Sequence, residues 1–335
     1  MQDTVVRKKD GIVATLGDVA AKAHVSKMTV SRVINHPEKV TRELRELVYA
    51  AMSELNYQPN IAAKALANNR TQIVKLFILE KMDTVEPYYM SLLAGLADAL
   101  DEKNYALQLV TKNSLEVGNC DGYVVTGMRN KDYGWLETVE KPIVLYGENQ
   151  MGFDYVDTDN LLGLRTSTNY AFTCGYTTVV FVGINLPDSF AESREKGYTL
   201  AMAAHHAPPI IYRVDNRSHI SDDLITKHFT KFPKNVCFVC ASDRLAIGVE
   251  RAIQRQGGKI PEDYGVIGFD GVFLDRIGSP QLTTIRQPVQ KMGYETGRMV
   301  LRKIEENGSP QGHEVFVSTL VPRGTTRAPK SLPAK

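Results

Sequence analysis

Four apolar residues near the start of the chain recur at i, i+3, i+4 and i+7, namely Leu16, Val19, Ala20 and Ala23. This spacing places a narrow apolar stripe along one side of a helix. Thr15 and Asp18 have the spacing of a capping box, in which the hydroxyl accepts a backbone N–H and the carboxylate reaches back over the first turn. The pattern predicts a short helix that begins just after Thr15.

A second short helix is predicted directly after the first. Ser26 has the position of an N-cap, and Val30, Val33 and Ile34 form an inward face. Two short helices joined by a tight turn around His24 make a helix-turn-helix. The outward face carries Lys27, Met28, Thr29, Ser31, Arg32 and Asn35. Such polar groups suit DNA phosphates and base edges, although a polar face alone also fits a helix that is merely solvated.

The residues that follow decide between these interpretations. Thr41 is expected to cap a third helix that runs to about Leu55 and completes a headpiece. The segments LGDVAAKAHVS, TVSRVIN and NYQPN follow one another in order between residues 16 and 60. In this order and spacing the chain resembles the lactose-repressor/galactose-repressor (LacI/GalR) family of bacterial transcription regulators. Later segments match as well, including SREKGY, ASDRLAIGV, GVIGFDG and LTTIRQP, so the resemblance covers nearly the whole chain.

From residue 71 onward, short apolar runs alternate with helical patterns. Strands are expected at 73–79, 105–110, 123–126, 142–147 and 155–160, with a helix over 87–100, and the alternation repeats from residue 178. Strands that alternate with helices predict parallel, doubly wound sheets. Two such halves predict two lobes with a cleft at the carboxyl ends of the strands. The expected fold class is an all-α headpiece followed by a two-lobed α/β body.

The resemblance implies a body folded like the periplasmic sugar-binding proteins, with the chain crossing between lobes near Asn160, Gln287 and Glu314. The expected parts are a flexible arm at 1–14, a helix-turn-helix headpiece at 15–59, a hinge helix or linker at 60–70, an effector-binding and dimerisation domain at 71–330 and a tail at 331–335. Within the large domain, lobe 1 is expected at about 71–160 and 288–313, and lobe 2 at about 161–287 and 314–330.

The net charge becomes informative when it is divided between these parts. The whole chain carries a formal charge of +2, but residues 1–70 hold 11 basic and 7 acidic residues, whereas the remainder holds 29 basic and 31 acidic residues. A polyanion should therefore bind at the headpiece end.

No apolar run precedes Thr15, and no stretch approaches the roughly 18 uninterrupted apolar residues of a membrane span. We therefore expect no signal peptide, no membrane contact and a cytoplasmic location, which the small number of cysteines fits. Cys237 and Cys240 have the spacing of a redox or metal-ligating pair, but VCFVCAS is typical of a buried strand, which favours a structural role. No cofactor and no metal site are predicted.

The resemblance assigns DNA contacts to individual residues. Base readout is expected from Thr15, Leu16, Lys27, Met28 and Arg32, phosphate contacts from Ser26, Thr29, Ser31, Asn35, Thr41, Tyr57 and Asn60, and minor-groove contacts from Ala63 and Leu66. Arg32 is the expected bidentate partner of a guanine. Leu66 stands where the family's hinge helix wedges a leucine between base pairs, although a flexible linker with an incidental leucine also fits this segment.

The resemblance also places an effector site in the cleft, with Tyr88, Tyr89, Arg194, Ser242, Asp243 and Asp270 as its members. Carboxylates and guanidinium groups bind adjacent hydroxyls in pairs, and aromatic rings pack on the apolar face of a sugar, so this set suits a polyol. Asp243 could instead cap a helix that begins at Arg244, and Tyr89 could belong to the core. Asp188 and Glu192 could supply selectivity or line a wet loop.

Two features depart from the family pattern. His24 occupies the turn where relatives usually have glycine, and histidine tolerates a positive φ only at some cost. Only about eleven residues separate the strand that ends near Val110 from the one that begins near Gly122, whereas a parallel crossover usually needs a dozen or more. One face of lobe 1 should therefore be thinly covered.

The predicted function is a sequence-specific transcription regulator, namely a repressor of carbohydrate-utilisation genes that binds a palindromic operator as a homodimer. A sugar or sugar-phosphate effector in the cleft is expected to control it, with the sign of control left open. One alternative is a catabolite regulator controlled by a phosphocarrier protein, and a weaker one is a sugar-binding transport protein. An enzyme is not expected, because no glycine-rich phosphate motif or metal-ligand cluster is present.

Overall fold

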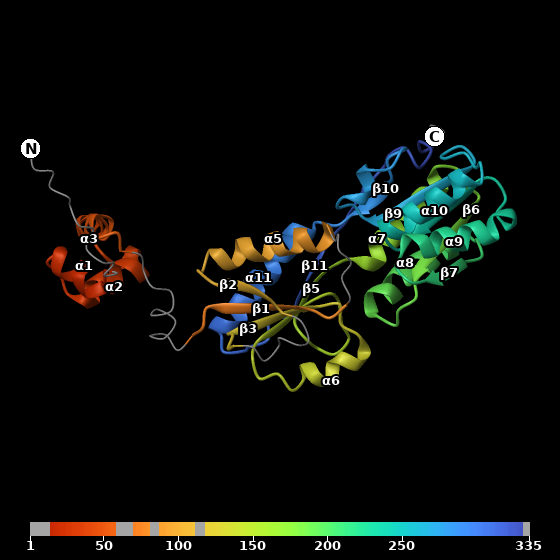
Figure 1. Cartoon of the computed structure of the whole chain (residues 1–335). Coiled ribbons are helices and arrows are strands. Elements are labelled where there is room, and N and C mark those ends of the chain that lie inside the picture. The colour runs from red at the N-terminus through yellow and green to blue at the C-terminus, as the bar shows by residue number, and fades with distance from the viewer. Residues whose placement is uncertain (1–13, 58–69, 81–86, 111–117, 331–335) are drawn as a thin grey trace, which may run out of the picture. The chain divides into compact units, whose positions relative to one another are not determined.

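The computed structural model describes residues 14–57, 70–80, 87–110 and 118–330 (Figure 1). By its internal contacts the chain divides into two units, Met1–Thr71 and Gln72–Lys335. The first unit contains the headpiece and the second contains the body. The expected arm, the tail and most of the hinge, including Asn60, Ala63 and Leu66, lie outside the described residues.

The headpiece is a set of short helices around a small apolar core. Its elements are α1 (Leu16–Lys22), α2 (Lys27–Asn35), the 3-10 helix η1 (Pro37–Lys39) and α3 (Arg42–Glu54). The buried core residues come from all three α-helices and are Val19, Ala20, Ala23, Val30, Val33, Val48 and Ala51. The predicted helix-turn-helix and third helix are confirmed.

Each α-helix of the headpiece begins at a hydroxyl N-cap. Thr15 and Asp18 form the predicted capping box: Thr15 N donates to Asp18 Oδ2 at 2.8 Å, and the Thr15 hydroxyl accepts from Asp18 N at 3.3 Å. Hydrogen bonds from Thr15 hold the pKa of the Asp18 carboxyl below its usual value. Ser26 caps α2 by accepting from Thr29 N at 3.0 Å, and Thr41 caps α3 in the same way.

The turn between α1 and α2 contains a residue in the left-handed region. His24 has a φ of 53°, a conformation that is uncommon for residues other than glycine. Val25 N donates to Ala20 O at 3.0 Å and closes the turn around it. The histidine therefore adopts a backbone conformation that glycine adopts more readily, and the helix-turn-helix forms nonetheless.

Replacing Ser26 with Ala should loosen the start of α2. Loss of a serine N-cap typically destabilises a helix by about 1 kcal/mol, which corresponds to roughly fivefold faster exchange of the amides that open with it. Hydrogen exchange of the α2 amides, followed by mass spectrometry on the full chain, measures this change. Ser53→Ala, an exposed position near the end of α3, is the matched control. Equal exchange in both variants would contradict the assigned cap.

Lobe 1 is built on a six-stranded sheet with strand order β11-β5-β4-β3-β1-β2, in which all neighbouring pairs are parallel. Its strands are β1 (Ile73–Ile78), β2 (Ala106–Val110), β3 (Gly122–Thr126), β4 (Ile143–Tyr146), β5 (Tyr155–Thr158) and β11 (His313–Phe316). Its helices are α5 (Pro87–Asp101), η3 (Asn130–Asp132), α6 (Tyr133–Leu136) and α11 (Val289–Glu305). The helices α5 and α11 pack against each other over one face of this sheet (Figure 1).

Lobe 2 repeats the plan with strand order β12-β10-β9-β8-β6-β7. Its strands are β6 (Thr178–Ile184), β7 (Ile210–Val214), β8 (Val236–Cys240), β9 (Tyr264–Asp270), β10 (Thr283–Arg286) and β12 (Thr319–Val321). Its helices are α7 (Asn160–Thr173), α8 (Ser189–Ala204), α9 (Ser218–His228), η4 (Phe229–Lys231), α10 (Asp243–Arg255) and η5 (Leu274–Arg276). The predicted doubly wound α/β body is confirmed, except that the edge strand β12 runs antiparallel to β10.

In the described part of the body the chain passes between the lobes three times. The first passage lies at Asp159, between β5 and α7, and the second lies at Gln287, between β10 and α11. Both are near their predicted positions. The third is predicted near Glu314, but β11 keeps pairing with β5 up to Phe316, so the passage follows that residue instead. Asp159 N donates to Phe316 O at 2.8 Å and ties the first passage to the third.

The second face of the lobe 1 sheet carries a separate apolar cluster that includes Phe77, Val125 and Leu145. Among the described residues, the helical cover on this face comes from the short elements η3 and α6, and Leu136 of α6 packs into the cluster. The thin face expected from the sequence stays a prediction. Most of the short 111–121 connection lies outside the described residues.

All four cysteines are buried free thiols. Burial raises the pKa of the Cys237 and Cys240 thiols, both of which lie on the fully buried strand β8, as expected for structural residues. The described segments contain no cluster of three or more metal-binding side chains. None of the helices in these segments is long and apolar enough to cross a membrane.

Candidate functional site

The outward face of α2 carries three of the side chains predicted to read bases. Met28 is 71% exposed, and Lys27 and Arg32 are exposed as well. Met28 and Arg32 are four residues apart, so they lie on the same side of the helix. The Lys27 side chain lies close to the first turn of α1. Its Cε would be 3.0 Å from a Cβ atom placed on Gly17. The headpiece thus presents two cations beside an apolar side chain.

The hydroxyls predicted to contact phosphates lie mostly at helix N-termini. The Ser26 and Thr29 hydroxyls are 2.8 Å apart in the first turn of α2, and Thr41 begins α3. Backbone N–H groups at a helix N-terminus favour an anion, so these positions suit a phosphate. Ser31 is half-buried farther along α2, and Tyr57 is half-buried against the headpiece core.

The remaining predicted DNA contacts differ in placement. Thr15 is exposed at the start of α1, whereas Leu16 is half-buried against the core. Asn35 is the last residue of α2, and its side chain lies outside what the structure describes.

A cavity of about 970 Å³ is lined by residues of both lobes of the body. All six residues predicted to bind the effector line it, namely Tyr88, Tyr89, Arg194, Ser242, Asp243 and Asp270. The fold therefore brings together side chains that are up to 182 positions apart in the sequence. Their use in binding stays a prediction.

Arg194 of α8 is held in place from several sides. Its Nε donates to Asn160 Oδ1 at 2.8 Å, and its Nη1 donates to Ala241 O at 2.6 Å. The guanidinium carbon lies 3.9 Å from the centre of the Phe269 ring and 5.1 Å from that of Phe190. The residue is only 7% exposed. Its Nη2 donates to no acceptor among the described residues. That nitrogen is therefore available to a ligand oxygen.

Asp270 ends β9 at the cavity with a φ of 136°, a strained conformation for a residue with a side chain. Gln287 holds it there, because its backbone N donates to Asp270 O at 2.9 Å and its Nε2 donates to Asp270 Oδ1 at 3.0 Å. The Tyr88 hydroxyl donates to Gln287 Oε1 at 3.3 Å and lies 3.1 Å from the Tyr146 hydroxyl. Burial raises the pKa of Asp270 to about 6, although the charge of Arg194 opposes the shift.

Ser242, not Asp243, is the N-cap of α10, because its Oγ accepts the backbone N–H three residues later at 3.1 Å. The alternative that makes Asp243 the cap is wrong. The buried Asp243 carboxylate accepts from Thr284 Oγ1 at 2.6 Å and from Gly271 N at 2.8 Å. Burial, followed by the nearby Asp270 carboxylate, raises the pKa of Asp243 well above its usual value. Through these hydrogen bonds Asp243, at the start of α10, connects the end of β9 with β10 at the cleft.

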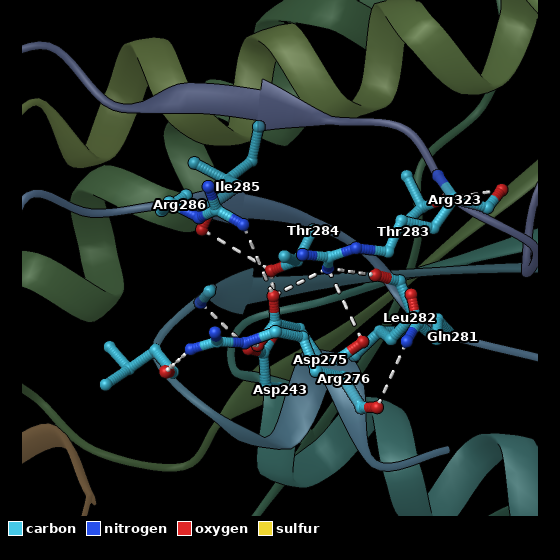
Figure 2. Close-up of polar contacts among 12 residues, drawn as sticks. Asp243, Asp275, Arg276, Gln281, Leu282, Thr283, Thr284, Ile285, Arg286 and Arg323 are labelled. Atoms are coloured by element: carbon cyan, nitrogen blue, oxygen red, sulfur yellow. Dashed lines mark hydrogen bonds and ion pairs between the residues drawn. The ribbon is translucent and has the colours of Figure 1, made fainter. Parts of the chain in front are cut away.

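A second buried carboxylate braces the loop after β9. Asp275 is fully buried, and Figure 2 shows arginine side chains gathered around it. Its Oδ2 lies 2.6 Å from Arg323 Nη1 and 3.8 Å from Arg286 Nη2, and its Oδ1 lies 3.7 Å from Arg276 Nε. These ion pairs fix η5 to the second sheet. The wall of the cavity beside Asp270 is thereby held in place.

Sequence reasoning missed several residues that line the cavity from lobe 1, including Glu148, Asp157 and Tyr146. The buried Asp157 carboxylate accepts from Glu148 N at 2.8 Å and from Asn160 Nδ2 at 3.0 Å. Burial raises the pKa of Glu148 to about 6 and raises that of Asp157 as well. A signal was present, because Asp157 lies at the carboxyl end of β5, where ligands bind in such folds.

Two family descriptions match the chain. Residues 15–60 match "Bacterial regulatory proteins, lacI family", and residues 169–326 match "Periplasmic binding protein-like domain". The first range covers the headpiece described above. The second begins within α7 and runs past β12, so it covers all the strands of lobe 2 together with α11 and β11 of lobe 1.

Similar proteins include the uncharacterized HTH-type transcriptional regulator YvdE of Bacillus subtilis, which is 52% identical over 314 residues, covering 93% of this chain and 99% of YvdE. The HTH-type transcriptional regulator CelR of Thermobifida fusca is 28% identical over 312 residues, covering 87% of this chain and 92% of CelR.

Two solved structures show the same fold over nearly the whole chain. The complex of the transcriptional regulator CelR with cellobiose has a TM-score of 0.72 at 26% identity and covers 93% of this chain and 99% of that chain. The lac repressor dimer bound to operator and the anti-inducer ONPF has a TM-score of 0.76 at 23% identity and covers 95% of this chain and 100% of that chain.

Proposed function

The chain belongs to the lacI family of bacterial regulatory proteins, and from this premise we propose that it represses carbohydrate-utilisation genes under the control of a sugar in its cleft. It is a transcription regulator and not an enzyme. One observation carries the proposal: the same chain has an exposed basic recognition helix and a cavity lined by all six predicted effector residues.

We propose that α2 enters the major groove of operator DNA. Arg32 would contact a guanine edge, and Met28 would touch a thymine methyl or exclude a wrong base. A homodimer would place two such helices on the half-sites of a palindrome. The proposed place of action is the bacterial cytoplasm, where the operator is.

The geometry of the cleft favours a polyol as effector. Arg194 offers Nη2, and Asp270 offers a half-buried carboxylate, so the two groups together can bind adjacent hydroxyls. Relatives support a sugar, because CelR was solved with cellobiose, and ribose operon repressors of Haemophilus influenzae and Halalkalibacterium halodurans are 28% and 26% identical to this chain. A sugar phosphate is the second candidate.

Control would come from coupling between the cleft and the segment that joins the two units. Sugar binding that changes the spacing of the lobes would alter how residues 60–70 meet the DNA. By linkage, the operator then changes sugar affinity by the same factor as the sugar changes operator affinity.

The test starts with selection of duplexes from a randomised DNA pool by the full-length protein. Fluorescence anisotropy then compares the enriched palindrome with a scrambled duplex at moderate salt, with and without a panel of saccharides. We expect a preference of about a thousandfold or more for the palindrome and a change in that affinity when one saccharide is added. Equal binding to both duplexes would contradict the proposal.

Acidification should weaken sugar binding. The pKa of Asp270 is raised to about 6, so its carboxylate is mostly ionised at pH 7 and mostly protonated at pH 5. Because the ionised form accepts sugar hydroxyls, affinity should fall by about tenfold as the pH drops from 7 to 5. Calorimetric titration at several pH values measures this change, with circular dichroism as a check on folding. In the control Asp270→Asn, affinity is lower at pH 7 and this pH step disappears; an unchanged step in that variant would contradict the assignment.

A further inference from the structure

A second polar cluster lines the same cavity. Arg129 follows β3 in lobe 1, and Asp188 directly precedes α8 in lobe 2, yet Arg129 Nη1 lies 2.6 Å from Asp188 Oδ2. The Asp188 side chain is 7% exposed and that of Arg129 is 23% exposed. An ion pair that is largely shielded from water therefore joins the two walls of the cleft.

Glu80 completes this cluster on the lobe 1 side. Its Oε2 lies 3.5 Å from Arg129 Nη2, and its Oε1 accepts from the Tyr89 hydroxyl. One guanidinium group thus lies between two carboxylates. Among the described contacts, the one cation of the Glu80–Arg129–Asp188 cluster is therefore paired with two carboxylates.

Two neighbouring tyrosines separate this cluster from the site at Arg194 and Asp270. The rings of Tyr88 and Tyr89 meet edge to face, with centres 5.8 Å apart. The Tyr88 hydroxyl belongs to the network of Gln287 and Asp270, whereas the Tyr89 hydroxyl donates to Glu80. A ligand that contacts both networks would therefore lie beside this aromatic pair.

Asp188 has hydrogen-bonding capacity that the protein does not use. It occupies the N-cap position of α8, but its side chain makes no cap hydrogen bond. Its Oδ2 pairs with Arg129, while its Oδ1 is buried and has no hydrogen-bond partner in the described segments. A buried carboxylate oxygen without a donor is destabilising. A ligand hydroxyl beside the ion pair would supply the missing donor once the side chain turns this oxygen toward the cavity.

The charges of this cluster and the volume of the whole cavity limit the ligand class. A phosphate group would meet two carboxylates and a guanidinium already paired with both, whereas neutral hydroxyls can donate to the carboxylates and accept from the guanidinium. The cavity, at about 970 Å³, is near the upper end of the usual range of roughly 300–1,000 Å³ for small-molecule pockets. A single hexose would leave much of it empty.

We infer that Glu80, Arg129 and Asp188 form a second subsite of the cleft, which binds the hydroxyl groups of a second ring of an uncharged oligosaccharide. The first ring of this ligand lies against Arg194 and Asp270. The inference rests on the proposed function, because it requires a sugar in the cleft. It favours a neutral saccharide of at least two rings at this cluster, although Arg217, Arg244 and Arg251 also line the cavity.

Calorimetric titration of the full-length protein tests this subsite. The probes are the disaccharides cellobiose, maltose, lactose, sucrose and trehalose, their constituent monosaccharides, and glucose 6-phosphate. The variants are Asp188→Asn, the charge-neutral double variant Arg129→Gln with Asp188→Asn, and Arg194→Gln. Glu192→Gln is the matched control, since it removes the same charge from an exposed position in the first turn of α8, just after Asp188. The melting temperature of each variant reports whether it is folded.

We expect the wild type to bind at least one disaccharide tenfold or more tighter than its monosaccharides and to bind the sugar phosphate more weakly than either. Asp188→Asn and the double variant should reduce the preference for the disaccharide to below about threefold and leave monosaccharide affinity within about twofold. Glu192→Gln should keep the full preference, and Arg194→Gln should weaken both sugars.

Three results would overturn the subsite while leaving the proposed function standing. They are an unchanged disaccharide preference in folded Asp188→Asn, tightest binding by a monosaccharide, and tightest binding by glucose 6-phosphate. Failure of the wild type to bind any saccharide, together with operator binding that no saccharide alters, would instead overturn sugar control itself.

Discussion

Replacing Arg194 with Gln should abolish the response to the effector, with a loss of sugar affinity of about a hundredfold or more and operator binding retained. The guanidinium is buried, donates to Asn160 and to Ala241 O, and stacks on the Phe269 ring. Glutamine cannot reproduce a planar, charged group with several donors, and truncating a buried charged partner in a binding site typically costs about 2–5 kcal/mol.

Calorimetry with the saccharide that binds best to the wild type measures this loss, and anisotropy with the operator shows whether the response disappears. Arg213→Gln is the control, because Arg213 is half-exposed on β7, pairs with Glu195 and does not line the cavity. Sugar affinity within about threefold of wild type in folded Arg194→Gln would rule out a ligand role for this residue.

Replacing Arg32 with Ala should weaken operator binding by about 1–3 kcal/mol, or roughly fivefold to more than a hundredfold, and should relax selectivity at one base pair. Arg32 is exposed on the outward face of α2, one turn from the exposed Met28. A bidentate contact with guanine distinguishes that base from the others, so its removal should make all four bases nearly equivalent at one position of each half-site.

Anisotropy with the operator and its single-base variants tests this expectation. Arg42→Ala removes the same charge from an exposed position on α3 that pairs with Glu46, so it controls for charge alone. That control should weaken binding evenly across all variants. Undiminished selectivity of Arg32→Ala at every position would show that the base is read by another residue.

The headpiece was predictable because its signals are local. Thr15, Ser26 and Thr41 each stand directly before a short amphipathic pattern, and a cap hydrogen bond spans only three residues. The left-handed turn at His24 is local too. The cap residues and the spacing of apolar residues were therefore enough to place three helices and the outward face of α2.

The cleft was predictable only in part, because its contacts join distant segments. The family pattern pointed to both Asp270 and Arg194, and the strand pattern pointed to a cleft at the carboxyl ends of the strands. The sequence could not show that the Asp243 carboxylate accepts hydrogen bonds from Thr284 and Gly271, since these partners come from β10 and from the loop after β9. It also could not show that Asp188, a plausible cap by position, reaches across to Arg129, 59 residues away.

Lobe 1 cannot complete its sheet until the end of the chain has been synthesised, because its edge strand is β11. Its residues, His313–Phe316, form the edge strand beside β5, and α11 covers the same sheet just before it. While the ribosome is still making lobe 2, the nascent lobe 1 has an unpaired strand edge and an uncovered apolar face, both of which favour aggregation. Translation that stops before residue 313 should therefore yield a body in which neither lobe is complete, so truncated products should be substrates for chaperones and proteases rather than partly active regulators.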